Sequence, residues 1–158
     1  MEFAQQLQQT ALARWIGESG SLLGYPFLLF LHTLGLATIA GLNAGIDLRI
    51  LGMAPGIKLA PMIRFYPVMW LAFAITVISG LALLIADATT KLAQPIFYVK
   101  LLLVLLAVVT MQVMKTRVLA DPQIDERPLQ ASARTLAVTS LLLWIGATIA
   151  GRLIAYLV

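Results

Sequence analysis

The sequence predicts an all-α integral membrane protein, a single-domain four-helix bundle preceded by an amphipathic helix that lies in the membrane interface. Of its 158 residues, 61% are hydrophobic and only 11% are charged, and the mean hydropathy is +0.94. Soluble domains carry about 25% charged residues. Four apolar segments of membrane-spanning length are separated by polar connections, and most of the basic residues lie in two of these connections.

The N-terminal segment, residues 1–18, has apolar side chains at helical spacing. Phe3, Leu7, Ala11 and Trp15 recur on one face, and glutamines lie opposite. The segment lacks the basic start and continuous apolar region of a signal peptide. It therefore predicts one short amphipathic helix lying in the interface.

The first span covers about residues 22–51 and contains the sole histidine, His32. A histidine inside an apolar span is costly and is by default a candidate functional residue. On a 3.6-residue period it shares a face with Asn43, and Asp47 lies at the edge of that face. We expect Asn43, Asp47 and Arg49 to have structural roles. Asp47 is expected to pair with a basic side chain of the connections, namely Arg64, Lys115 or Arg117.

Gly41 and Gly45 lie on roughly the opposite face of the first span. Small residues four apart let two helices approach closely in a membrane. The pair predicts a close helix contact, either inside the bundle or between subunits of a homo-oligomer.

The remaining spans are three further apolar runs. They cover about residues 66–86, 95–114 and 134–156, and the stretches 53–62, 88–94 and 115–133 are expected to be polar connections.

The distribution of basic residues predicts the orientation. The first and third connections with their flanks hold seven Lys and Arg, whereas the N-terminal segment and the second connection hold two, Arg14 and Lys91. Cytoplasmic loops carry the excess of Lys and Arg. We therefore expect a multi-pass protein of the bacterial inner membrane with both termini in the periplasm. The seven are Arg49, Lys58, Arg64, Lys115, Arg117, Arg127 and Arg134.

Four ionisable residues are expected at one depth in the outer third of the membrane. His32 and Lys100 follow the prolines that open their spans by six and five residues, Asp87 ends the second span, and Arg152 is near the end of the fourth. At 1.5 Å per residue each lies within roughly 10 Å of the outer boundary. Lys100 and Arg152 could instead extend to lipid headgroups, and Asp87 could have a structural role by capping a helix end or pairing with one of these cations. His32 could donate a hydrogen bond to a backbone carbonyl.

This constellation predicts a site for haem b and a role in electron transfer. Haem iron takes a neutral imidazole, so His32 is the candidate metal ligand, and Lys100 and Arg152 are candidate partners of the propionates. A quinone pocket, with His32 donating a hydrogen bond to a carbonyl, is the rival. Copper is a weaker candidate, because most of the methionines lie toward the other side of the membrane, where they suit flexible packing.

Other classes of function stay open. The chain could be a structural or anchoring subunit of a larger membrane complex, or a transporter, although the inverted repeats typical of transporters are not visible. The absence of cysteine excludes disulfides, thiolate metal sites and thiol nucleophiles. The positive net charge of +4 is explained by membrane topology, so we expect the lipid bilayer and no nucleic acid as a partner.

The stretches 31–37 (LHTLGLA) and 47–52 (DLRILG), with Gly41 between them, resemble a family of small bacterial membrane proteins of unknown function. More distantly, His32 and the stretch 99–104 (VKLLLV) are similar to the copper-resistance CopD family and the HemJ-type protoporphyrinogen oxidases. That resemblance implies a role for a first-span histidine and a third-span lysine, and an association with haem b. The chain lacks the further histidine expected late in the third span.

Overall fold

The computed structural model describes residues 2–156, apart from the side chain of Phe3. Within these residues all regular secondary structure is helical. Four helices are long and apolar enough to cross a membrane, which confirms the all-α class and the four predicted spanning segments. Counted with their short flanking helices, they cover Tyr25–Ile50, Ala60–Ala86, Pro95–Leu119 and Ala131–Leu153.

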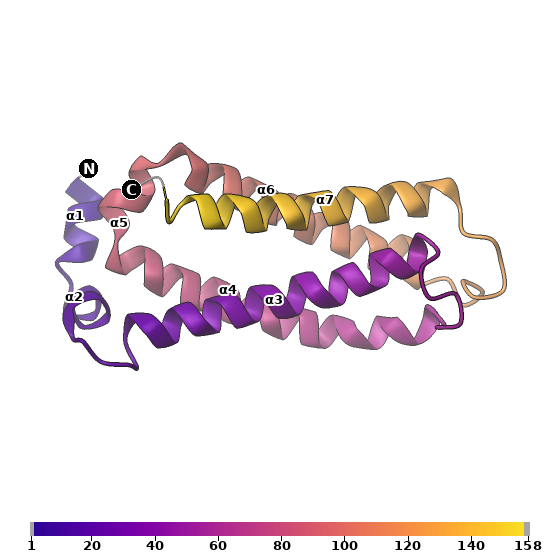
Figure 1. Cartoon of the computed structure of the whole chain (residues 1–158), viewed down its shortest axis with the longest axis horizontal. Helices are drawn as coiled ribbons and strands as arrows, with labels where there is room; N and C mark the ends of the chain where they lie inside the picture. The colour runs from indigo at the N-terminus through magenta and orange to yellow at the C-terminus, as the bar shows by residue number, and fades with distance from the viewer. Residues whose placement is uncertain (1, 157–158) are drawn as a thin grey trace.

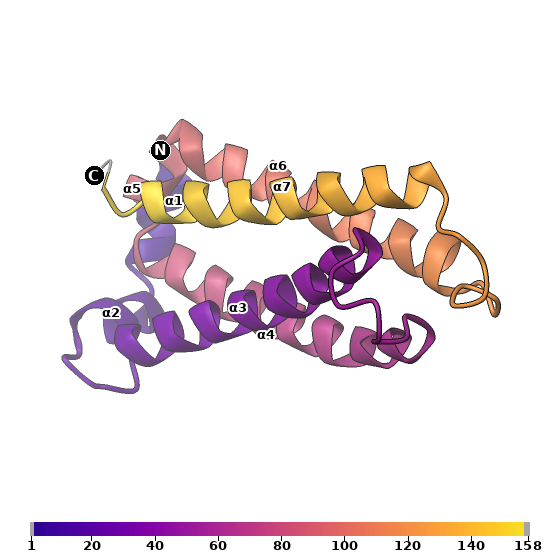
Figure 2. The same ribbon diagram turned by 45° about the vertical axis from the view of Figure 1, so that its right-hand side comes forward.

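The four long helices are arranged as two antiparallel pairs. Helix α3 (Tyr25–Ile50) packs against α4 (Tyr66–Ala86), and α6 (Pro95–Met114) packs against α7 (Ala131–Leu153). The pairs meet through α3 and α7 (Figure 1). The polypeptide begins and ends on one side of this assembly, which we call the N-terminal end, and the opposite side is the loop end (Figures 1 and 2).

The N-terminal segment forms two helices rather than the one expected, α1 (Glu2–Gln8) and α2 (Ala11–Glu18). The break is caused by Thr10, whose hydroxyl donates to the Leu7 carbonyl and accepts a hydrogen bond from the amide of Ala13. A threonine in this position is a favourable N-cap. Helix α1 packs against the short helix α5 (Ala88–Ala93), and α2 packs against α4.

The connections contain more helix than expected. The stretch 53–62 leads into a 3₁₀ helix, η1 (Ala60–Phe65), the stretch 88–94 contains α5, and α6 continues as a π-helical turn, η2 (Lys115–Leu119). Helix α5 forms directly after α4 because the Lys91 ammonium donates to the Leu83 carbonyl at 2.9 Å and lies 3.9 Å from the Asp87 carboxylate. These contacts bind the last turn of α4 to α5.

Prolines in the first turns of α3, α4 and α6 account for where these helices begin, since the missing N–H would have no helical partner there. Large buried apolar side chains gather in the loop half of the four long helices, where Ile46, Tyr66, Met69 and Met111 are each at most 1% exposed. In the N-terminal half the buried residues are mostly small, for example Ser79, Ala147 and Ala150.

Candidate functional site

The imidazole of His32 is held between α3 and α4. Its Nδ1 lies 2.9 Å from the backbone carbonyl oxygen of Thr76. A carbonyl can only accept, so Nδ1 carries the proton and donates it, which leaves the lone pair on Nε2. The hydroxyl of Ser79 lies 3.4 Å from the same Nδ1 and donates to the Ile75 carbonyl at 2.6 Å. The ring therefore has a fixed orientation and a fixed tautomer.

Lys100 of α6 approaches the free nitrogen of this ring. Its Nζ lies 3.5 Å from Nε2 of His32, and both side chains are partly buried. The Lys100 ammonium is a donor and Nε2 is an acceptor, so the contact is a long hydrogen bond. The two side chains join the α3–α4 pair to the α6–α7 pair in the N-terminal half of the molecule.

Two glycines make room for these side chains. A Cβ atom added to Gly80 of α4 would lie 2.9 Å from Cε1 of His32, and one added to Gly151 of α7 would lie 3.3 Å from Cε of Lys100. Even an alanine at Gly80 would collide with the imidazole in its present place. The close approach of α4 to the ring is thus a property of that glycine.

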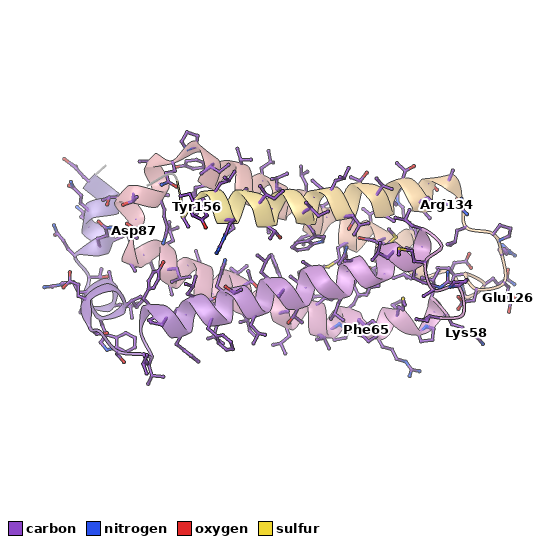
Figure 3. The ribbon with its side chains drawn as sticks, in the orientation of Figure 1. Lys58, Phe65, Asp87, Glu126, Arg134 and Tyr156 are labelled. Carbon is purple, nitrogen blue, oxygen red and sulfur yellow. The ribbon has the colours of Figure 1, made fainter. Side chains whose placement is uncertain are left out.

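Asp87 and Arg152 lie at the same end of the molecule but have other contacts. Figure 3 labels Asp87 and Tyr156 there, and Lys58, Glu126 and Arg134 at the loop end. The exposed Arg152 guanidinium lies 5.7 Å from the ring centroid of Tyr156. Asp87 approaches Lys91, as described above. The structure brings His32 and Lys100 together, whereas Asp87 and Arg152 lie at the N-terminal end of the molecule and contact other residues.

A second polar cluster is buried in the loop half. The amide nitrogen of Asn43 donates to the Asp47 carboxyl group and to the Ser140 hydroxyl, each at 2.6 Å. All three side chains are at most 2% exposed. The bond from Asn43 to Asp47 lies within α3, and the bond from Asn43 to Ser140 links α3 to α7.

The expected ion pair of Asp47 is wrong. Within residues 2–156 the one ion pair is between Lys91 and Asp87. Asp47 faces α7 and bonds to Asn43, whereas the Lys115 ammonium lies over the ring of Tyr66 at 5.4 Å from its centroid. The 3.6-residue period places Asp47 on the inner face, and the long basic side chains reach outward to solvent.

Arg49 of α3 contacts the backbone of the first connection. Its guanidinium donates to the backbone carbonyls of Ile57 and, at 3.1 Å, Pro55, which holds the first connection against the end of α3. The carboxylate of Asp125, from the third connection, accepts hydrogen bonds from the amides of Leu59 (2.7 Å) and Ala60 (3.0 Å). These amides, chiefly that of Leu59, lower the pKa of Asp125 below its ordinary value.

Sequence reasoning missed the residues that position the imidazole. Thr76, Ser79 and Gly80 of α4 form a short polar and small-residue step inside an otherwise apolar run. Their spacing of three and four residues puts them on one helix face, which was a usable signal. Ser140 and Asp125 were also missed, because nothing in the sequence identifies their partners.

The candidate site offers one imidazole nitrogen, which is fewer protein ligands than a metal ion without a porphyrin requires. Within residues 2–156, no group of three or more His, Cys, Asp or Glu side chains could hold a metal ion. Iron in a porphyrin needs only axial ligands from the protein, so this arrangement is compatible with haem.

Comparison of the chain with protein-family models, curated proteins and solved structures gives no match. The similarity to CopD-like and HemJ-like proteins is therefore a resemblance of short segments.

Proposed function

We propose that the chain is a multi-pass protein of the bacterial inner membrane, with its four long helices forming a bundle and its loop end in the cytoplasm. The basic residues at the loop end support this orientation, because Lys and Arg are retained on the cytoplasmic side. Leu12 and Trp15 of α2 are 54% and 47% exposed, which supports contact of the N-terminal segment with the outer interface. A periplasm-active reporter fused after Val158 should be active, and activity of a cytoplasmic reporter there would contradict this orientation.

Within that bundle, His32 would hold the iron of haem b, and the protein would take part in electron transfer near the outer face. The observation that carries this proposal is the hydrogen bond from His32 Nδ1 to the Thr76 carbonyl. Histidines that bind metals almost always donate their other ring N–H to a carboxylate, carbonyl or water, which fixes the tautomer and raises the basicity of the ligating nitrogen.

The residues present are compatible with a haem group on three counts. Nε2 of His32 is the unprotonated ring nitrogen, whose lone pair accepts the long hydrogen bond from Lys100, large apolar side chains are concentrated in the other half of the long helices, and two cations lie near the N-terminal end. Lys100 has to turn away from Nε2 before iron can bind there, and its flexible four-carbon chain allows that. Lys100 and Arg152 would then be the cations available to propionates.

Bound haem would supply a one-electron iron couple. The chain's own residues would orient the site: Thr76 holds the imidazole plane, Gly80 permits α4 to approach that ring, and Gly151 leaves space beside Lys100. The contacts with Thr76 and Gly80 restrict how far His32 can rotate.

A quinone is the second candidate ligand, favoured by the ammonium donors of Lys100 beside the imidazole. A quinone carbonyl accepts hydrogen bonds but takes no axial bond. A structural or anchoring role is the third candidate, since the His32–Lys100 contact also joins two helix pairs without any ligand.

The test compares detergent-purified wild type with His32→Ala and Thr33→Ala. Thr33 is the neighbouring residue on the exposed face, and its hydroxyl bonds only to Leu29 of its own helix. With haem bound, wild type and Thr33→Ala show a Soret band with reducible α and β bands, and His32→Ala loses it. Lys100→Ala lowers haem retention without abolishing it, because a propionate contact contributes less than the iron bond. A colourless wild type that yields a quinone on extraction would favour the second candidate.

A further inference from the structure

A basic pocket lies at the loop end, far from His32. Its volume is about 220 Å³, and it is formed by the end of α3, the first and third connections and the first turn of α7. Three arginines and one carboxylate line it, together with the apolar side chains of Ile50, Leu59, Ile124 and Leu129. The charged residues of the lining are Arg49, Arg127, Arg134 and Asp125.

Two of the four charged side chains that line the pocket have hydrogen-bond partners within residues 2–156, and two have none. The carboxylate of Asp125 accepts from two backbone amides, and Arg49 donates to two backbone carbonyls. Among residues 2–156, the guanidinium groups of Arg127 and Arg134 have no hydrogen-bond or ion-pair partner. Two residues whose guanidinium donors are unused therefore line one pocket.

The backbone around the pocket adds to its positive character. Arg134 lies in the first turn of α7, a helix with no acidic residue in that turn. The start of a helix carries a partial positive charge, so an arginine there is uncompensated. Helix α3 ends at Ile50, and Gly52 follows its C-cap residue Leu51 with a φ of +101° and an amide that donates to the Arg49 carbonyl, as is typical of a glycine after a helix end. Gly52 lines the pocket without adding a side chain.

We propose that this pocket binds the phosphate group of an anionic phospholipid headgroup. Guanidinium groups bind phosphate through two parallel N–H···O bonds, and Arg127 and Arg134 have such forks free. The site lies where two spanning helices end, which is the level of lipid headgroups, and its apolar side chains suit the glycerol end of a lipid. A soluble phosphate compound offers the same anion without the apolar part.

The experiment measures binding of phosphatidylglycerol, phosphatidylcholine and inorganic phosphate to purified protein in detergent by native mass spectrometry. The test variant is Arg127→Gln/Arg134→Gln. The matched control is Arg64→Gln/Arg117→Gln, which removes the same charge from exposed arginines at the same end that do not line the pocket. Helical circular dichroism checks that each variant is folded.

Wild type and control are expected to bind phosphatidylglycerol with equal affinity and in preference to phosphatidylcholine. The test variant should bind it roughly tenfold more weakly or worse, since charge-assisted hydrogen bonds are the stronger class. Equal loss in the control would show a general charge effect and overturn the site. Binding of inorganic phosphate as tightly as the lipid would overturn the lipid assignment in favour of a soluble phosphate compound.

A charge-conserving pair covers the case in which the glutamine variant does not fold. Arg127→Lys/Arg134→Lys keeps both charges but removes the planar forks. A several-fold weaker affinity for phosphatidylglycerol supports the pocket, and an unchanged affinity contradicts it.

Discussion

Replacement of Gly35 by alanine tests the packing that holds His32 in place. A Cβ atom at Gly35 would collide with Oγ1 of Thr76 and would lie 2.8 Å from the backbone carbonyl oxygen of Ala72. The hydroxyl cannot simply turn away without cost, because it donates to that same carbonyl at 2.9 Å. Helix α4 must therefore move away from α3, and Thr76 carries the carbonyl that binds the imidazole.

The magnitude follows from two opposing effects. Overpacking in a well-packed interior costs about 1–3 kcal/mol, and a clash with backbone belongs at the upper end of that range. The gain in helix propensity from Gly to Ala is about 1 kcal/mol. We expect Gly35→Ala to lower the free energy of unfolding by about 2 kcal/mol, net of these effects.

Gly41→Ala is the matched control, since a Cβ atom there meets nothing within 4 Å. It should be neutral or stabilising by up to about 1 kcal/mol. Unfolding in mixed detergent micelles, followed by circular dichroism, measures both variants against wild type. The reasoning is refuted if Gly35→Ala is as stable as Gly41→Ala.

Three further predictions concern other parts of the chain. Asn43→Leu should lower the free energy of unfolding by about 1–3 kcal/mol, because it leaves buried acceptors without a donor, and Ser140→Ala should cost less; equal effects in the micelle assay would contradict this. The pKa of Asp125 is lowered in the folded chain, so its hydrogen bonds to the first connection should be fully present above pH 3.8, the ordinary pKa of an aspartate, and be lost as the pH falls through the lowered pKa. Limited proteolysis of residues 53–59 measures this loss. Asp125→Asn should be cleaved faster than wild type at neutral pH and show no such acid dependence. Replacing both Gly41 and Gly45 by leucine should reduce the mass of a homo-oligomer in detergent, because an added Cβ atom at either glycine would meet nothing within 4 Å and the face is open to a second copy. An unchanged mass would show that this face contacts lipid instead.

The spans were predictable from sequence because each is a long apolar run opened by a proline or closed by charge. The helix expected at about 66–86 lies at Tyr66–Ala86, and the one expected at about 95–114 lies at Pro95–Met114. The fourth begins earlier and ends earlier than expected, at Ala131–Leu153. Its first turn contains Ser132 and Arg134, which resemble loop residues in composition although they continue the helix.

The sequence predicted the depth of residues along the spans, but not which helix faces contact each other. Counting along two spans puts His32 and Lys100 at one level, and their nitrogens lie 3.5 Å apart in the structure. The same counting could not identify Thr76 as the partner of His32, because that depends on which face of α4 meets α3. Asp47 shows the same limit, since its depth is near the basic side chains while its direction is toward α7.

The sequence could not show which glycines pack against another helix and which have free space beside them. Gly35 and Gly41 belong to the same helix, yet the first lies against α4, whereas a Cβ atom added at the second would meet nothing within 4 Å. Spacing alone favours Gly41 with Gly45, and the structure places the close intrachain contact at Gly35 instead. The physical reason is that a helix has several small-residue faces, and only tertiary packing selects one.

The most direct test of the central claim is the haem-to-protein ratio of the purified wild-type chain, measured beside His32→Ala after haem has been added to both. Wild type is expected to hold haem b in a fixed ratio to protein, and His32→Ala to hold almost none while keeping its helical circular dichroism. A wild type that carries no chromophore and binds none when haem is added would contradict the account, and the contact of His32 with Thr76 and Lys100 would then be a quinone site or a structural link between helix pairs.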